Sequence, residues 1–102
     1  MSRLLEMKSE MARVDENPPT ECTKYEFVRA IRALDQSLYA SLMRLYSSSV
    51  EIQFFWNTVN DLDRANADFQ RLSDAAGLDD VKLYDIFHWI GIDRVKAKYG
   101  GA

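Results

Sequence analysis

Apolar residues recur at spacings of three and four along most of the chain, a period that is typical of amphipathic α-helices. The first stripe lies within residues 2–14 and consists of Leu4, Met7, Met11 and Val14. The segment from Asp15 to Pro19 then stops the helix, because a residue before proline avoids the helical conformation and proline cannot continue the hydrogen-bond ladder. We therefore expect residues 1–17 to comprise a semi-independent N-terminal amphipathic helix and Pro-Pro linker.

Polar residues that cap helices divide the next part of the chain. Thr23 and Glu26 fit a capping box at the start of a helix that carries Phe27, Ile31 and Leu34. Asp35 predicts the N-cap of a second helix, which carries Leu38, Leu42 and Leu45. Two short helices with a tight joint are expected.

The serines at 47–49 predict another cap, ahead of the most aromatic helix of the chain. Its apolar stripe is formed by Ile52, Phe55, Val59 and Leu62, and it is widened by Phe54 and Trp56. We expect this helix to extend to Leu62 and to lie near the centre of the fold.

A turn and two further helices follow. Asn66 or Asp68 is expected to cap the first of them, and Gly77 suits the position just after its C-terminus. The second begins near Asp79 and is expected to end at Gly91, with one or two additional helical turns before the C-terminus.

The sequence contains no period-2 alternation of strand length. We predict an all-α fold, a compact bundle of about six short helices, in which residues 23–99 form a single helical domain. The apolar faces predict ten core side chains: Phe27, Ile31, Leu42, Ile52, Phe55, Val59, Phe69, Leu72, Tyr84 and Phe87.

Charge and composition narrow the classes of partner. A net charge of −3 and a pI near 5.1 make nucleic acid an unfavourable partner. The sequence has neither a signal-peptide core nor the roughly 20 consecutive apolar residues that span a membrane. Its single cysteine excludes an intramolecular disulfide, so we expect a protein of a reducing intracellular compartment without membrane partners.

Residues with catalytic or metal-binding chemistry are isolated along the sequence. His88 is the only histidine, and Cys22 has no second cysteine with which to build a metal site. A Cys22–His88 nucleophile and base pair is a remote alternative, because a lone cysteine at the start of a helix is more often inert or a cap. Residues 61–72 begin like a calcium loop but lack its turn glycine and its final glutamate. We therefore expect no enzyme activity, cofactor, metal ion or small-molecule substrate.

Residues 69–84 also have the pattern of a helix, a glycine turn and a second helix, which is typical of DNA-binding motifs. The second helix would present Asp79, Asp80 and Asp85 against a single Lys82. Binding to phosphates needs the opposite balance of charge. DNA binding is therefore the weaker interpretation.

The capping and apolar positions between residues 23 and 78 resemble a known group of proteins. Thr23 through Phe27, a serine followed by V-x-I and an aromatic pair at Ser49 through Trp56, Asp61 through Asp63, and Leu72 through Leu78 carry the resemblance. They are similar to small helical proteins encoded among the tail and other structural genes of tailed bacteriophages. The resemblance implies a phage origin and a role in or around the virion.

Two classes of function follow from these observations. The first is a non-enzymatic protein–protein interaction module, a structural or assembly protein of the tail region that is made in the host cytoplasm. Its partners would be other phage structural proteins or further copies of itself. The alternative is a small acidic phage regulatory protein that inhibits a host protein or acts as a weak DNA-binding regulator.

Exposed apolar and aromatic positions are the expected partner contacts: Leu4, Met7, Met11, Val14, Phe54, Trp56 and Trp89. A helix as short as residues 2–14 is marginal in water by itself, so its stripe needs a surface to cover it. Self-association, docking to a partner, and packing on its own domain are the three alternatives for this helix.

Overall fold

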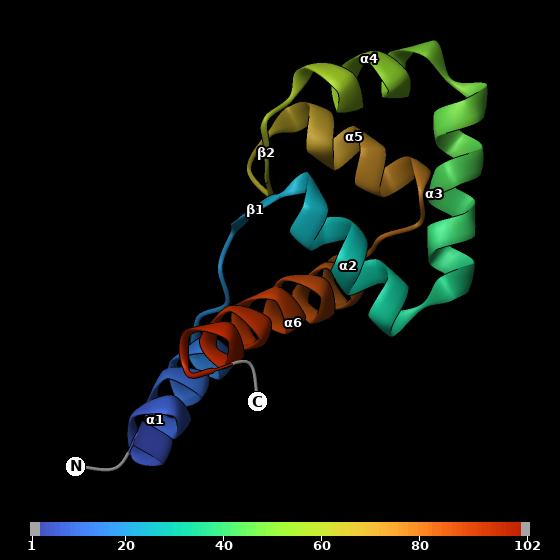
Figure 1. The fold of residues 1–102 in the computed structure, drawn as a ribbon. Helices are drawn as coiled ribbons and strands as arrows, with labels where there is room; N and C mark the ends of the chain where they lie inside the picture. The colour runs from blue at the N-terminus through green and yellow to red at the C-terminus, as the bar shows by residue number, and fades with distance from the viewer. Residues whose placement is uncertain (1–2, 101–102) are drawn as a thin grey trace.

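A computed structural model describes residues 3–100 of the 102-residue chain (Figure 1). The all-α prediction is confirmed, because six helices make up nearly all of the regular structure in this part of the chain. Ser2, the expected first residue of the N-terminal helix, lies outside the described residues. The elements are α1 (Arg3–Glu16), β1 (Glu21–Thr23), α2 (Lys24–Leu34), α3 (Gln36–Ser48), α4 (Val50–Thr58), β2 (Asp61–Asp63), α5 (Ala67–Ala75) and α6 (Asp80–Lys98).

The helices begin at the caps that the sequence predicts. At α2, the Thr23 hydroxyl accepts a hydrogen bond from the Glu26 backbone N–H at 3.1 Å, and the Glu26 carboxylate accepts one from the Thr23 N–H at 3.0 Å. Short polar side chains also cap the four following helices, namely Asp35, Ser49, Asn66 and Asp79. Each cap bonds backbone N–H groups that the first turn of a helix leaves without an internal partner.

A two-stranded antiparallel sheet was not predicted. It pairs β1 with β2, and Cys22 lies opposite Leu62. These two side chains are buried, while their flanking residues are largely exposed. Three-residue strands are too short to show alternation in the sequence, and their pairing joins segments about 40 residues apart. Because β2 takes residues 61–63, α4 ends at Thr58 and the expected extension to Leu62 is wrong.

Helix α6 continues through Gly91, so the predicted helix end at this residue is also wrong. The glycine serves close packing instead. A Cβ atom at Gly91 would lie 2.6 Å from Val14 Cγ1 and 2.9 Å from Pro19 Cδ. Gly77 has the expected role, with a φ of +75° just after the C-cap of α5.

Three phenylalanines lie at the centre of the core. Phe27 contacts Phe69 edge-on at a centroid distance of 5.6 Å, and Phe69 contacts Phe87 in the same manner at 6.2 Å. Ile31 and Leu72 are buried beside them, as predicted.

The remaining predicted core residues lie further out. Leu42, Ile52, Phe55 and Val59 are half-buried at the edge of the core. Tyr84 is 40% exposed, and its placement in the core was wrong because its hydroxyl donates to the Asp15 carbonyl on α1. Helix α4 is therefore peripheral, and the expected position of this helix at the centre of the fold is wrong.

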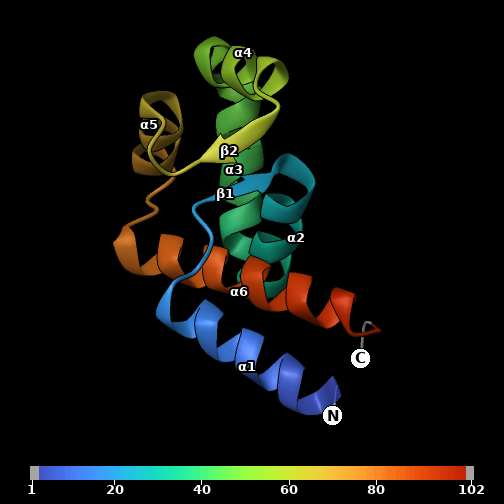
Figure 2. The same ribbon diagram turned by 90° about the vertical axis from the view of Figure 1, so that its left-hand side faces the viewer.

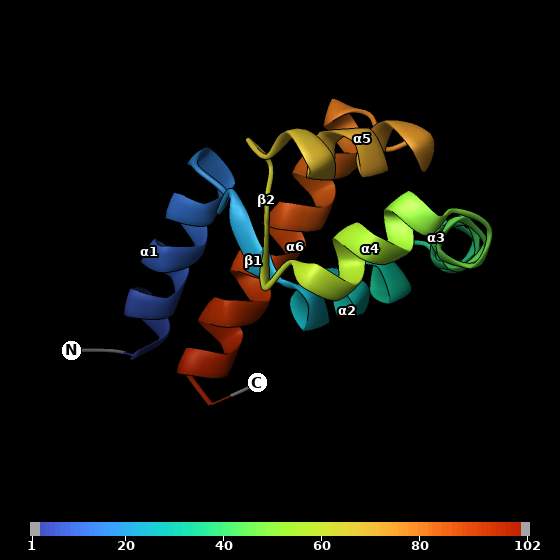
Figure 3. The same ribbon diagram turned by 90° about the horizontal axis from the view of Figure 1, so that it is seen from above.

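The molecule is elongated, with extents of 52 × 24 × 24 Å. Helix α1 runs antiparallel to the C-terminal half of α6 and forms one end (Figure 2). Helix α3 forms the opposite end, where Figure 3 shows it along its axis. The N-terminal helix thus packs on its own chain.

Candidate interaction surface

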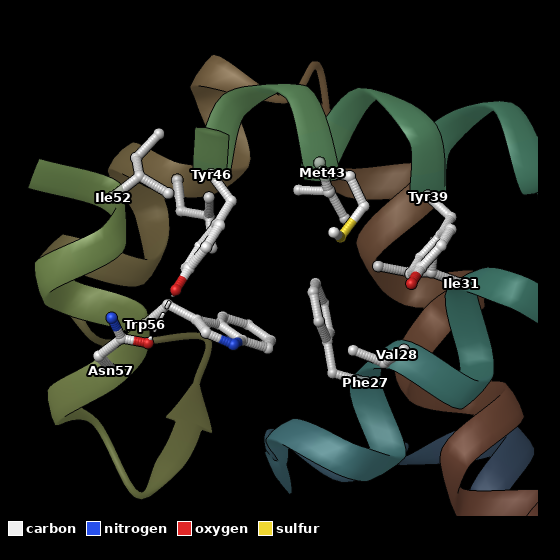
Figure 4. Close-up of a pocket in the computed structure, with 11 residues that line it drawn as sticks. Phe27, Val28, Ile31, Tyr39, Met43, Tyr46, Ile52, Trp56 and Asn57 are labelled. Carbon is white, nitrogen blue, oxygen red and sulfur yellow. Dashed lines mark hydrogen bonds between the residues drawn. The ribbon is translucent and has the colours of Figure 1, made fainter. Parts of the chain in front are cut away.

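A cavity of about 300 Å³ lies between α2, α3 and α4. In Figure 1 these helices form three sides of a frame, and Leu72 of α5 contributes to the lining. Eleven uncharged residues line the cavity, as shown in Figure 4: Phe27, Val28, Ile31, Tyr39, Leu42, Met43, Tyr46, Ile52, Trp56, Asn57 and Leu72.

Helix α3 supplies one wall through Tyr39, Leu42, Met43 and Tyr46. The last three follow Tyr39 by three, four and seven positions, so all four lie on one face of the helix. Figure 4 shows Met43 and Tyr46 projecting from α3 toward the side where Phe27 and Trp56 lie. The buried side chains of Phe27, Ile31 and Leu72 form the base of the cavity.

The walls of the cavity remain accessible to solvent. All residues of α3 and α4 are at least partly exposed, and the Met43 side chain is 48% exposed. Tyr39, Leu42, Ile52 and Trp56 pack against the core and also line the cavity, where they stay partly exposed. The volume and the apolar lining of the cavity fall in the range that is typical of binding pockets.

Hydrogen bonds hold α3 and α4 together beside the cavity. The Tyr46 hydroxyl donates to Asn57 Oδ1 at 3.2 Å, and Gln53 Nε2 donates to the Tyr46 carbonyl at 2.6 Å. The bond to Asn57 holds the Tyr46 ring at the edge of the cavity, as Figure 4 shows.

Two cations lie beside aromatic residues of the lining. Lys24 Nζ donates to the Trp56 carbonyl at 3.0 Å and lies 5.9 Å from the centroid of the Trp56 ring. The Arg32 guanidinium lies 5.5 Å from the centroid of Tyr39. Lys24 therefore neighbours the α4 wall and Arg32 the α3 wall, and both project from α2.

Two carboxylates lie at the N-termini of α3 and α4. Asp35 is engaged as the cap of α3: its carboxylate accepts hydrogen bonds from the Ser37 hydroxyl at 2.6 Å and from the backbone N–H of Ser37 and Leu38. These bonds, led by that of Ser37, lower the pKa of Asp35. Glu51 is exposed in the first turn of α4.

The predicted partner residues of α4 and α6 do not converge on one surface. Trp56 is half-buried and lines the cavity. Phe54 is 70% exposed and is not part of the lining. Trp89 is half-buried against the core, with the Arg29 guanidinium 5.5 Å from its ring centroid.

The predicted stripe of α1 faces α6 for most of its length. Val14 packs against Gly91, Met7 and Met11 are half-buried, and Leu4 is 53% exposed. Polar contacts join the same two helices: His88 Nε2 lies 2.6 Å from Asp15 Oδ1, and Lys98 Nζ donates to Glu10 Oε1 at 2.7 Å. Lys98, followed by the Tyr99 hydroxyl, lowers the pKa of Glu10.

Sequence reasoning missed five residues of the cavity, namely Val28, Tyr39, Met43, Tyr46 and Asn57. For α3 it selected the leucines at 38, 42 and 45 as the apolar face. A signal was available, because Tyr39, Met43 and Tyr46 share a helical face and combine aromatic rings with an adaptable thioether.

Cys22 and His88, the candidate nucleophile and base, lie in different surroundings. Burial raises the pKa of the Cys22 thiol to about 12, so this thiol is protonated at neutral pH and is a poor nucleophile. His88 stacks on Tyr84 at a centroid distance of 5.6 Å in addition to its contact with Asp15. Within residues 3–100, no group of three or more histidine, cysteine, aspartate or glutamate side chains is placed to hold a metal ion.

Helices α5 and α6 are joined by a short turn at Gly77, as the helix-turn-helix pattern predicts. Asp79, Asp80 and Asp85 are all exposed at the start of α6, so this end of the helix is acidic. Over the same described range, no helix is both long and apolar enough to cross a membrane.

Comparison of the chain with protein-family models, curated proteins and solved structures gives no match. The cavity and its surroundings are therefore the basis for a functional conclusion.

Proposed function

We propose that this protein is a non-enzymatic protein–protein interaction module, a structural or assembly protein of the tail region of a bacteriophage particle. The observation that carries the proposal is the apolar cavity between α2, α3 and α4, with its partly exposed walls. A concave site of about 300 Å³ with an aromatic and aliphatic lining is typical of binding sites in proteins.

The composition of the cavity supports a protein partner. Tyrosine, tryptophan and methionine are enriched in protein–protein interfaces, and all three types occur in the walls. The link to a phage particle rests on the resemblance carried by residues 23–78. The partners would be other phage structural proteins or further copies of this chain.

A second candidate is a small acidic regulatory protein that inhibits a host protein. The exposed aspartates at the start of α6 favour it, because they form an acidic end that a basic partner surface would attract. A weak DNA-binding regulator is a less favourable form of this candidate, since the same aspartates would repel phosphates.

Quantitative mass spectrometry of purified phage particles tests the first proposal. A structural component is expected at a defined copy number well above trace, in proportion to other tail proteins. Cross-linking in infected cells extends the test to assembly proteins that leave before maturation. Absence from particles together with cross-links only to host proteins would contradict the proposal and favour the acidic inhibitor.

A further inference from the structure

We infer that the cavity between α2, α3 and α4 receives one amphipathic helix of a partner protein, with carboxylates on either side of its apolar residues. This inference rests on the proposed interaction function and specifies the partner. Three properties of the cavity support it: its length, its lining and the charges on α2.

The length of the cavity suits a short stretch of helix. Its lining on α3 runs from Tyr39 to Tyr46, seven residues or about 10 Å of helix. An incoming helix of two turns presents apolar side chains at positions i, i+3 or i+4, and i+7, which is the usual pattern of a helix bound in a groove. A cavity of about 300 Å³ holds such side chains but not a folded domain.

The lining favours apolar side chains over a polar small molecule. The base consists of buried apolar residues, including Phe27, Ile31 and Leu72. The polar groups of the lining lie in its walls, and two of them, Tyr46 and Asn57, already bond each other. Met43 adds an adaptable side chain, which suits a contact that forms on binding.

The charges define the flanks of the incoming helix. Lys24 and Arg32 are eight residues apart on α2, which corresponds to about 12 Å along the helix axis. Each is held beside an aromatic ring of the lining rather than in an ion pair of the described residues. A partner helix that lies along α2 would therefore match them with Asp or Glu residues seven or eight positions apart.

A peptide library tests this inference directly. Randomised 14-residue helical peptides would be displayed and selected for binding to the whole protein, and the selected peptides would then be synthesised. We expect sequences with apolar residues at helical spacing between two acidic residues seven or eight positions apart. Their affinity should fall as salt rises, because exposed charge pairs are screened.

Variants of the protein test whether the selected peptides bind at the cavity. Met43→Trp fills the mouth of the cavity and is expected to weaken binding at least 30-fold. Val50→Trp is the matched control, since Val50 is 80% exposed on α4 and is not part of the lining, and it should leave binding unchanged. Lys24→Met with Arg32→Met should weaken binding about three- to tenfold and flatten its salt dependence. Circular dichroism of each variant checks that the helices are retained.

Each result has a defined meaning. Selected peptides with basic flanks, or peptides that bind Met43→Trp as well as the original protein, would overturn the inference. Selection of no peptide, with saturable binding of a small apolar dye that Met43→Trp abolishes, would instead indicate a small-molecule site. The inference fails in these cases even if the protein is present in particles, whereas the proposed function fails only by the particle and cross-linking measurements.

Discussion

At the scale of single residues, Glu26 connects the start of α2 with α6. Its carboxylate caps the helix and also bonds the Arg94 guanidinium at 2.6 and 2.8 Å. Arg94 in turn donates to the Glu21 carbonyl on β1, so one ion pair joins three elements. The Arg94 hydrogen bond is the main reason that the pKa of Glu26 falls from 4.5 to about 2.

This lowered pKa predicts a pH-dependent contribution to stability. Because the folded pKa lies below the unfolded one, the contribution is present above about pH 4.5 and is lost as pH falls toward 2. Glu26→Gln keeps the capping box but removes the charge, and we expect it to cost about 1 to 2 kcal/mol at pH 7, a value reduced for the partial exposure of Arg94.

Urea unfolding at pH 7 and pH 3 measures the effect. The difference between the original protein and Glu26→Gln should shrink to about half or less at pH 3. Arg71→Gln is the control, because its pair with Asp68 is largely exposed and should contribute little at either pH. An equal cost of Glu26→Gln at both values of pH would show that the charge does not act through Arg94.

At the scale of elements, the sequence predicts helix starts better than helix ends. Side-chain caps such as Asp35 and Asn66 act within three residues, so their signal is local. The end of α4 depends instead on the pairing of β2 with β1, which is a tertiary contact. The predicted helix end at Gly91 was wrong for the same reason, because the role of this glycine depends on tertiary contact with Val14 and Pro19.

Gly91 provides the prediction at this scale. Replacement by alanine favours an isolated helix by about 1 kcal/mol, but the new methyl group would displace Val14 and Pro19. We expect Gly91→Ala to destabilise the protein by about 1 to 2 kcal/mol, as measured by thermal or urea unfolding. Val14→Ala should relieve part of this cost, so the double variant should be more stable than the sum of the single changes predicts.

Gly77→Ala is the matched control for this cycle. Gly77 has a φ of +75° and nothing within 4 Å of the position of a Cβ atom, so its cost comes from the backbone alone. The free-energy costs of Gly77→Ala and Val14→Ala should therefore be additive in the double variant. Equal behaviour of the two glycines in the double-mutant cycles would exclude close packing as the role of Gly91.

At the scale of the whole molecule, the two ends of the protein have different characters. Helix α1 covers the C-terminal half of α6 at one end, whereas α3 and α4 leave a cavity open at the other. The sequence predicted Trp56 as a contact residue but not the α3 residues opposite it. Convergence of α2, α3 and α4 around one space follows from tertiary packing, which the period of a single helix does not specify.

Site-specific photo-cross-linking tests most directly whether this end of the molecule binds a phage protein. A benzophenone amino acid would replace Met43 at the cavity, or Asp85 on the exposed acidic side of α6, in protein produced during infection. We expect position 43 to yield a defined adduct with one phage structural protein, identified by mass spectrometry, and position 85 to yield none. Adducts from position 43 only with host proteins would contradict the proposed function, and adducts from position 85 alone would contradict the role of the cavity as the binding site.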